Sequence, residues 1–352
     1  MNPTPCIQIN KHRIGPGHPC YIIAELSANH RQDYQQAVEL VHAAKAAGAD
    51  AVKLQTYTPD TITLDCDAPA FNHAADSLWR GKNLYQLYQD AYTPWEWQPK
   101  LKALANHLGL DLFSSPFDPT AVDFLEKMEV PAYKIASFEI VDIPLIEKAA
   151  ATGKPLILST GMATAEEIGE AVMAARNAGG KDIALLKCCS AYPARPEEMN
   201  LNTLVDIQSR FRVPIGLSDH TLTTEIAVAA VALGACIIEK HFTLDRATPS
   251  ADAAFSLEPA EFRAMVQAVR TVEQALGTVA YGPTARERES LGFRRSLFVV
   301  DDIAPGECLT SANIRSVRPA SGLAPKELKN ILGRRARHVL RRGTPLQWED
   351  IE

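Results

Sequence analysis

Two lysines lie inside apolar segments and could bind an anionic substrate. Lys53 belongs to AVKLQT (51–56) and Lys134 to AYKIAS (132–137). An ammonium group is costly to bury without a partner, so each lysine needs an anion nearby. A local carboxylate would meet that need. The serines and threonines that end neighbouring segments favour a second interpretation, a cradle for a phosphate or carboxylate ligand.

Two histidines form the second candidate set. His220 ends PIGLSDH (214–220), and His241 lies near the end of CIIEKHFT (236–243). If these segments are adjacent strands, both imidazoles can bind one divalent ion and leave positions for water and substrate oxygens. The flanking Asp219 and Glu239 favour a metal site over two hydrogen-bonding core histidines. Manganese, iron, cobalt and zinc all suit such ligands.

The elements that must position these side chains are eight short apolar segments separated by helical patterns. Unbroken runs of Val, Ile and Leu are typical of strands buried on both faces. Their alternation with helices predicts a (β/α)8 TIM barrel, in which catalytic groups lie at the C-terminal strand ends. The segments are YIIAEL (21–26), AVKLQT (51–56), DLFSSP (111–116), AYKIAS (132–137), LILST (156–160), IALLKC (183–188), PIGLSDH (214–220) and CIIEKHFT (236–243).

An open doubly wound sheet is the structural alternative. That fold usually has a glycine-rich phosphate turn after its first strand, whereas AELSANH contains no glycine. The residues alone therefore predict a barrel enzyme that holds an anionic substrate against a metal ion. They leave its reaction open between aldol-like condensation, isomerisation and hydrolysis.

The pattern changes near the C-terminus, where a charged stretch interrupts the alternation. We expect a catalytic barrel over residues 1–283, a linker over 284–294 and a small β-rich domain over 295–352. A long insertion, residues 57–97, follows the second strand. Its aromatic residues either line an apolar wall for a sugar or pack an extra helix onto the barrel or across a dimer. They are Trp79, Tyr85, Tyr88, Trp95 and Trp97.

Composition excludes several classes of protein. The 352 residues carry a formal net charge of -6, which argues against nucleic acid as the main partner. The N-terminal residues lack a signal-peptide core, and no segment is apolar for long enough to span a bilayer, so we expect a cytoplasmic protein without a membrane partner. The 7 cysteines contain no C-x-x-C pair and are expected to be reduced.

The motifs together closely resemble the sialic acid synthase family. They cover residues 20–260 almost continuously, and the tail resembles the antifreeze-like (SAF) domain that follows the barrel in that family. The matching runs are IIAELSANH, AGADAVKLQTYTPDT, FSSPFD, VPAYKIASFEI, KPLILSTGMA, LLKCCSAYPA, IGLSDHT, ALGACIIEKHFTL, AFSLEP and RRSLFVVDDIAPGECLTSANIRSVRPASGL.

The resemblance implies a transferase that condenses phosphoenolpyruvate with a sugar aldehyde to form a nonulosonic acid. It implies a divalent metal, usually manganese, and a homodimer in which the SAF domain reaches the partner's active site. The metal ligands would be His220 and His241, and the catalytic residues Glu25, Lys53 and Lys134. Substrate binding would involve Ser137, Ser159, Ser190, Tyr192, Ser218, Asp252 and Arg318.

The insertion SLWRGKNLYQLYQDAYTPWEW resembles the branch of the family that uses the 6-deoxy sugar 2,4-diacetamido-2,4,6-trideoxy-L-altrose. Synthesis of N-acetylneuraminate or legionaminate is the alternative within the family. A non-catalytic sugar-binding protein is the alternative from another class, although a pure binder does not need the full set of strand-end residues. TLTTE after His220 and TPSADA before Phe255 replace glycine-containing loops of the family, which is expected to alter loop geometry there.

Overall fold

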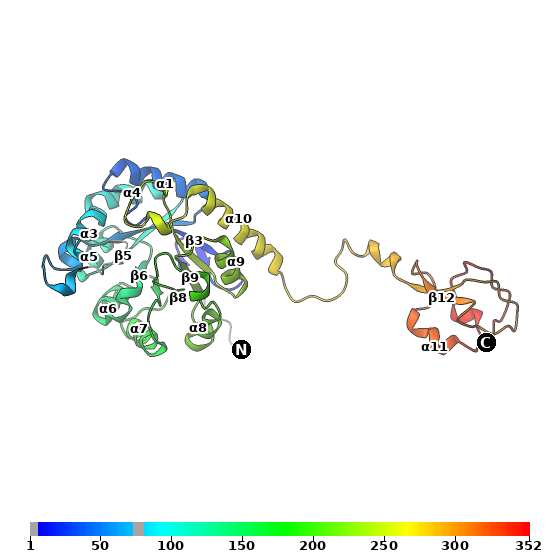
Figure 1. Ribbon diagram of the computed structural model, residues 1–352. Coiled ribbons are helices and arrows are strands. Elements are labelled where there is room, and N and C mark those ends of the chain that lie inside the picture. The colour runs from blue at the N-terminus through cyan, green and yellow to red at the C-terminus, as the bar shows by residue number, and fades with distance from the viewer. Residues whose placement is uncertain (1–5, 73–80) are drawn as a thin grey trace. The chain divides into compact units, whose positions relative to one another are not determined.

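The computed structural model describes residues 6–72 and 81–352, and its N-terminal part is a closed barrel of parallel strands (Figure 1). The strands follow the order β10-β3-β4-β5-β6-β7-β8-β9 around the barrel. The predicted (β/α)8 barrel is therefore confirmed. The strands are β3 Tyr21–Glu25, β4 Ala51–Thr56, β5 Asp111–Pro116, β6 Tyr133–Ile135, β7 Leu156–Ser159, β8 Ile183–Cys188, β9 Ile215–Asp219 and β10 Ile237–His241.

Helices surround the barrel and cover the outward faces of its strands (Figure 1). In the first of them, the Asp33 side chain accepts hydrogen bonds from the backbone N–H groups of Gln35 and Gln36, and Gly48 ends the helix at φ 95°. The helices are α1 Tyr34–Ala47, α4 Gln98–His107, α5 Pro119–Lys127, α6 Ile143–Ala151, α7 Ala165–Asn177, α8 Thr203–Phe211, α9 Thr224–Ala232 and α10 Pro259–Leu276.

A short hairpin of β1 (Ile7–Ile9) and β2 (His12–Ile14) lies at the N-terminal end of the barrel. Asn10 in its turn donates to Asp111 Oδ1 at 2.7 Å, and Tyr21 donates to Asp111 Oδ2, also at 2.7 Å. Asp111 and Tyr21 begin their strands, so these bonds fix the hairpin to the end of the barrel opposite the predicted site.

The insertion after β4 forms two short helices, α2 (Pro59–Ile62) and α3 (Leu84–Ala91). Tyr85 of α3 donates to Asp60 of α2 at 3.1 Å, which joins the two helices. Trp95 donates from Nε1 to the carbonyl of Tyr57 at 3.0 Å, so the end of the insertion returns to its beginning. Trp79 lies outside the described residues.

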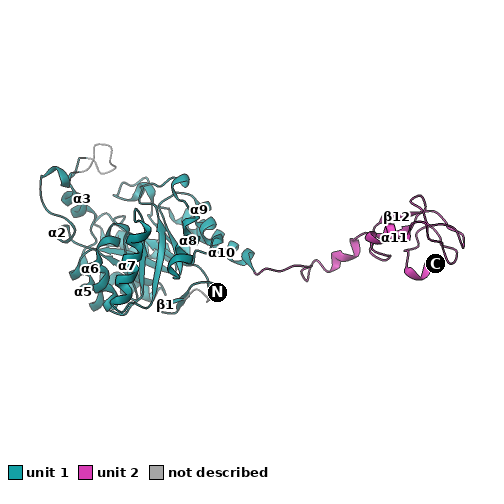
Figure 2. Ribbon diagram, turned by 90° about the horizontal axis from the view of Figure 1, so that it is seen from below, with its two compact units in different colours: residues 1–277 teal, residues 278–352 magenta. Residues whose placement is uncertain are grey.

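The chain divides into two compact units, residues 1–277 and 278–352 (Figure 2). The division falls shortly after α10 ends at Leu276, whereas the sequence analysis ended the barrel domain at residue 283. The second unit has its own apolar core and an antiparallel pair of strands, β11 (Ser296–Val299) and β12 (Ile314–Val317), with a short helix α11 (Leu328–Ile331).

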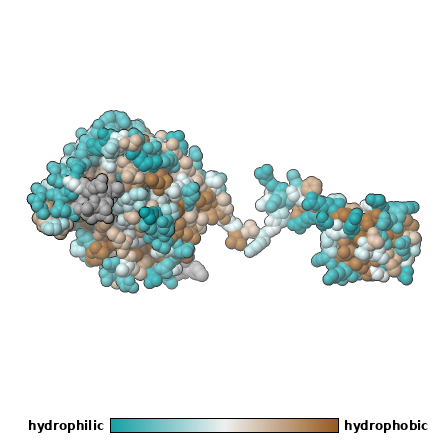
Figure 3. Space-filling view, viewed as in Figure 1, coloured by the Kyte–Doolittle hydropathy of each residue, from teal (hydrophilic) through white to brown (hydrophobic). Residues whose placement is uncertain are grey.

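The surface visible in Figure 3 is mostly hydrophilic, with scattered hydrophobic residues, while the large apolar side chains fill the cores. Within the described ranges, no helix is both long and apolar enough to span a membrane.

Candidate active site

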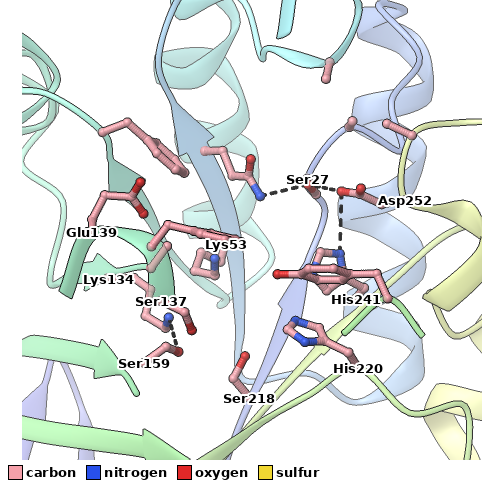
Figure 4. A pocket seen from close by; sticks show the side chains of 18 of the residues that line it. Ser27, Lys53, Lys134, Ser137, Glu139, Ser159, Ser218, His220, His241 and Asp252 are labelled. Carbon is pink, nitrogen blue, oxygen red and sulfur yellow. Dashed lines mark hydrogen bonds and ion pairs between the residues drawn. The ribbon is translucent and has the colours of Figure 1, made fainter. Parts of the chain in front are cut away.

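A cavity of about 370 Å³ opens where the barrel strands end on their C-terminal side. Side chains from several strands enter it because residues alternate between the interior and exterior of a barrel. The predicted residues on its lining are Lys53, Lys134, Ser137, Ser159, Tyr192, Ser218, His220, His241 and Asp252 (Figure 4).

The two lysines lie on either side of Glu239. Lys53 Nζ and Lys134 Nζ are each 3.7 Å from Glu239 Oε1. Lys53 also forms a close ion pair with Glu25, and Lys134 donates to Ser159 Oγ at 2.6 Å. All five side chains are buried, so both predicted partners of the lysines are present: local carboxylates and strand-end hydroxyls.

The carboxylates of this cluster differ in their affinity for protons. Burial raises the pKa of Glu25 to about 7, although Lys53 acts in the opposite direction. Burial also favours the neutral form of Glu239, but Lys134 and Lys53 outweigh it and lower the pKa of that carboxyl. Burial lowers the pKa of Lys134, so an anion entering the cavity would strengthen its cationic form.

The two histidines lie side by side, with ring centroids 5.2 Å apart. The Nδ1–H of His220 donates to the Cys189 carbonyl at 2.7 Å, which leaves its Nε2 lone pair available. His241 Nδ1 is buried, has no hydrogen bond to any described residue and lies 3.7 Å from Asp252 Oδ2. Burial, reinforced by His220, lowers the pKa of His241 and keeps its imidazole neutral. Burial disfavours the cationic form of His220, but Cys188 outweighs it and raises the pKa of that imidazole, so His220 must lose a proton before it binds a metal. With both imidazoles neutral, the donor set fits a divalent ion.

Asp219 does not belong to this site, and the expectation that it supports a metal there is wrong. Its Oδ2 accepts a hydrogen bond from Lys240 Nζ at 2.6 Å, and both side chains are fully buried. Asp219 and Lys240 each lie one position from a histidine and therefore face the other side of their strands. No group of three or more His, Cys, Asp or Glu side chains in the described parts of the chain is arranged to hold a metal. Two histidines would therefore share an ion with water and substrate oxygens.

Aromatic rings surround the histidine pair. The Tyr192 ring lies 4.6 Å from that of His220, and the Phe255 ring lies 4.8 Å from that of His241. The two aromatic rings are themselves 4.9 Å apart. Ser27 forms a close hydrogen bond with Asp252, which joins the first strand's loop to the loop after β10. These contacts hold the two imidazoles in place.

Ser137 reaches the cavity because Gly161 lies against it. The Gly161 N–H donates to Ser137 Oγ at 3.2 Å. A Cβ at residue 161 would lie 2.7 Å from that oxygen and 2.2 Å from Ser190 Oγ, so no larger residue fits without displacing both serines. Ser190 is thus held beside Ser137 but is not among the cavity-lining residues.

Two other predicted residues are not among those that line the cavity. Glu25 is fully buried beneath it and is held by Lys53 and by Gln55, whose Nε2 donates to Glu25 Oε1 at 3.2 Å. Arg318 follows β12 in the second unit and is exposed. Its role toward a sugar stays a prediction.

Four further residues line the cavity: Gln55 and Glu239, which the strand ends indicated without an assigned role, and Ser27 and Glu139, which the sequence analysis did not select. Gln55 and Glu239 share a strand face with Lys53 and His241, because each lies two positions from that residue. Burial raises the pKa of Glu139 to about 7, and its Oε2 has no hydrogen bond to the described part of the chain. Glu139 follows β6 in a short 3-10 segment, where strand spacing gives no signal.

The insertion aromatics have different roles. Tyr88 lines the cavity, whereas Trp95 packs on Phe124 with ring centroids 4.6 Å apart. Trp97 packs against His30 and Tyr34, both at 5.6 Å. Packing onto the barrel is therefore confirmed for Trp95 and Trp97, whereas contact of Tyr88 with a sugar stays a prediction.

Comparison with known proteins decides the family. A model described as the NeuB family matches residues 40–281, and one described as the SAF domain matches residues 294–352. The chain belongs to the NeuB family. The resemblance to sialic acid synthases is thus confirmed, including the SAF domain that follows the barrel.

Two curated relatives of the chain make related nonulosonic acids. Pseudaminic acid synthase of Helicobacter pylori is 48% identical over 95% of this chain and 98% of its own length. N,N'-diacetyllegionaminic acid synthase of Legionella pneumophila is 37% identical over 96% of each chain. The solved N-acetylneuraminic acid synthetase of Leptospira borgpetersenii, in complex with citrate, is 32% identical, with a TM-score of 0.72, over 82% of this chain and 95% of that one.

Proposed function

We propose that this NeuB-family chain condenses phosphoenolpyruvate with 2,4-diacetamido-2,4,6-trideoxy-L-altrose, releases phosphate and forms pseudaminic acid. The observation that carries this proposal is the pair of buried lysines facing the cavity beside two histidines. The 48% identity to a pseudaminic acid synthase supports the choice of sugar.

The phosphoenolpyruvate would lie between Lys53 and Lys134. Their charges would offset those of its phosphate and carboxylate, and three cavity hydroxyls would donate hydrogen bonds to its oxygens. The hydroxyls are those of Ser137, Ser159 and Ser218. Ser218 and Lys134 both contact Glu239. A ligand that binds to these two side chains would therefore change the protonation of the Glu239 carboxyl.

The proposal assigns a divalent metal, manganese in our expectation, to His220 and His241. When bound, the ion supplies a Lewis acid that polarises the sugar aldehyde. Support comes from the neutral His241 and from the orientation of His220, whose Nδ1–H donates to Cys189 and leaves Nε2 without a hydrogen bond to any described residue. Asp252 would orient His241 or contact the sugar.

Carbon 3 of phosphoenolpyruvate then attacks the aldehyde carbon, and carbon 2 becomes electron-deficient. Water adds to carbon 2, and the resulting tetrahedral intermediate expels phosphate by cleavage of its C–O bond. Glu25 is the candidate for taking the proton of that water, since burial brings its pKa to about 7 and the Lys53 and Gln55 side chains that contact it line the cavity. Orienting the sugar through Gln55 is its alternative role.

The proposal also includes a cytoplasmic homodimer in which Arg318 of one subunit reaches the sugar bound to the other. Its basis is the family resemblance and the exposure of Arg318. Arg318→Ala is expected to raise the KM for the sugar while leaving that for phosphoenolpyruvate unchanged. Arg315→Ala, at an exposed position of the preceding strand β12, is the matched control. Equal behaviour of the two variants would contradict the role given to Arg318.

Phosphate release with phosphoenolpyruvate and the diacetamido sugar, followed by mass spectrometry of the product, tests the reaction. A panel including the precursors of legionaminate and N-acetylneuraminate tests the choice of sugar. Treatment with a chelator should abolish turnover, and added manganese should restore it. His220→Ala should lose activity and bound metal, unlike His107→Ala at an exposed position of α4. Full activity after metal removal would exclude the metal role.

A further inference from the structure

Six neighbouring side chains that line the cavity form an apolar set, in addition to the lysines and histidines. Four of its six side chains have no polar atom, and the other two present aromatic rings. We call this set the apolar wall; its members are Tyr57, Ile62, Leu87, Tyr88, Ala91 and Phe117.

Ring contacts hold the apolar wall in place. The Tyr57 ring meets that of Tyr88 edge-on at 5.5 Å and that of Phe117 at 5.2 Å. Tyr57 is only 2% exposed, and Trp95 Nε1 donates to its carbonyl. The wall therefore combines residues that follow β4 and β5 with the inner face of α3, and aromatic packing fixes its shape before any ligand enters.

The apolar wall extends from the strand next to β3 to the side of the barrel mouth opposite His220; β3 alone separates β4 from β10. Tyr57 directly follows β4 and Phe117 directly follows β5, whereas the histidines belong to the ends of β9 and β10. In the closed strand order, β5 and β9 are separated by β6, β7 and β8 on one side and by β10, β3 and β4 on the other. A substrate whose reactive end lies between the lysines and the histidines (Figure 4) extends toward the wall.

We propose that the apolar wall binds the methyl end of the sugar and selects 6-deoxy sugars over sugars with a hydroxyl at carbon 6. This inference rests on the proposed function and names the part of the site that sets its specificity. A methyl group against Leu87, Ile62 and Phe117 leaves water for an apolar surface. A hydroxyl there loses water and finds no partner on these three side chains.

Different residues of the insertion pack on the barrel and line the cavity, which supports this role. Trp95 and Trp97 pack on α5 and α1 side chains, which is enough to anchor the segment. Leu87 and Tyr88 instead point toward the cavity, although α3 offers other faces for packing. The chain that follows α3 is thus packed on the barrel, and α3 itself presents Leu87 and Tyr88 to the cavity.

The test compares kcat/KM for the 6-deoxy diacetamido sugar with that for its 6-hydroxy analogue, at saturating phosphoenolpyruvate. In the wild type we expect a preference of about ten-fold for the 6-deoxy sugar. Leu87→Ala should reduce that preference several-fold without changing the KM for phosphoenolpyruvate. Leu84→Ala is the matched control, because Leu84 begins the same helix but does not line the cavity.

Leu87→Asn is a second test, because it should increase an activity, and a misfolded variant could not show such an increase. Its amide can pair with the extra hydroxyl, so kcat/KM for the 6-hydroxy sugar should rise above the wild-type value. If the wild type is active and both Leu87 variants keep its preference, the apolar wall does not set specificity and the proposed function still stands. If the wild type releases no phosphate with either sugar, the proposed function fails and this inference fails with it.

Discussion

Strand β10 carries two buried charges that differ in what surrounds them. Glu239 faces the barrel interior, where two lysines approach one of its oxygens at 3.7 Å each. Lys240, the next residue, faces outward and pairs with Asp219 at 2.6 Å. Lys240 also donates to Thr221 Oγ1 at 3.3 Å, so its charge is satisfied within the protein.

The difference shows what separates a structural ion pair from a ligand site. The outer pair matches one cation with one anion and leaves neither accessible. The inner cluster holds its cations more loosely around Glu239 and opens onto a cavity. Burial of a charge is therefore weak evidence of function, whereas a buried charge that faces a cavity can exchange its protein partner for a ligand.

Removing an inner lysine should have the largest effect on activity. Lys134→Met deletes a charge and a donor that face the anion, so we expect kcat/KM for phosphoenolpyruvate to fall by a factor on the order of 10³. Phosphate release measures the loss, and circular dichroism checks the fold. Lys187→Met is the control, because Lys187 is not on the cavity and donates to the Cys188 carbonyl. A near-normal rate for Lys134→Met would remove this lysine from the site.

Removing the outer lysine should instead affect stability. Lys240→Met leaves Asp219 buried without a counter-charge, which should lower the free energy of unfolding by about 3 kcal/mol. We expect the folded fraction to keep its kcat/KM within a few-fold. Urea unfolding measures the first quantity and phosphate release the second.

The double variant Lys240→Met with Asp219→Asn tests the cause. It removes both charges, while the amide oxygen introduced at position 219 can still accept the Thr221 N–H, which donates to Asp219 Oδ1 at 2.8 Å in the wild type. Much of the lost stability should return. A double variant less stable than Lys240→Met would show that the ion pair does not explain the loss.

Glu139 can be compared with both charge clusters. It is a carboxyl that lines the cavity, and its proton affinity is set mainly by burial. Burial raises its pKa to about 7 from an ordinary value near 4.5, so the folded chain binds this proton more tightly than the unfolded chain does. Its contribution to stability is complete below about pH 4.5 and is lost as the pH rises through about 7. Glu139→Gln should therefore gain stability relative to the wild type over that range, on the order of 2 kcal/mol.

Urea unfolding of both proteins at several pH values between about 4.5 and 8 measures this difference. Glu147→Gln, on an exposed position of α6, is the control. A pH-independent difference between Glu139→Gln and the wild type would mean that burial does not control this carboxyl.

The sequence predicted the barrel and many of the polar side chains that line the cavity because both follow from local patterns. Apolar runs gave the strands, and their polar ends gave Lys53, Lys134, Ser159 and the histidines. The error at Asp219 came from treating adjacent residues as neighbours in space. Alternation along a strand places them on opposite faces, as the pairing with Lys240 shows.

The apolar wall could not be predicted in this way. It unites residues after β4, residues after β5 and one face of α3, and their contacts depend on how the insertion folds back. Nothing in the local sequence separates Tyr88, which lines the cavity, from Trp95, which packs on Phe124. Arg318 belongs to the second unit, so its approach to a sugar stays a prediction from the family resemblance.

The smallest expected effect concerns Ser159 and Thr160, two adjacent residues at the end of β7 whose side chains point to opposite faces of the strand. Ser159 accepts a hydrogen bond from Lys134 Nζ at 2.6 Å, whereas Thr160 donates to the Leu186 carbonyl at 3.2 Å. Ser159→Ala should raise the KM for phosphoenolpyruvate about ten-fold, since the variant lacks a hydroxyl that bonds to Lys134 and that would donate to the ligand. Thr160→Val loses a hydrogen bond of its own but no contact with Lys134, so its KM should stay at the wild-type value. Equal shifts in the two variants would mean that general loosening of β7, rather than access to the cavity, explains the effect.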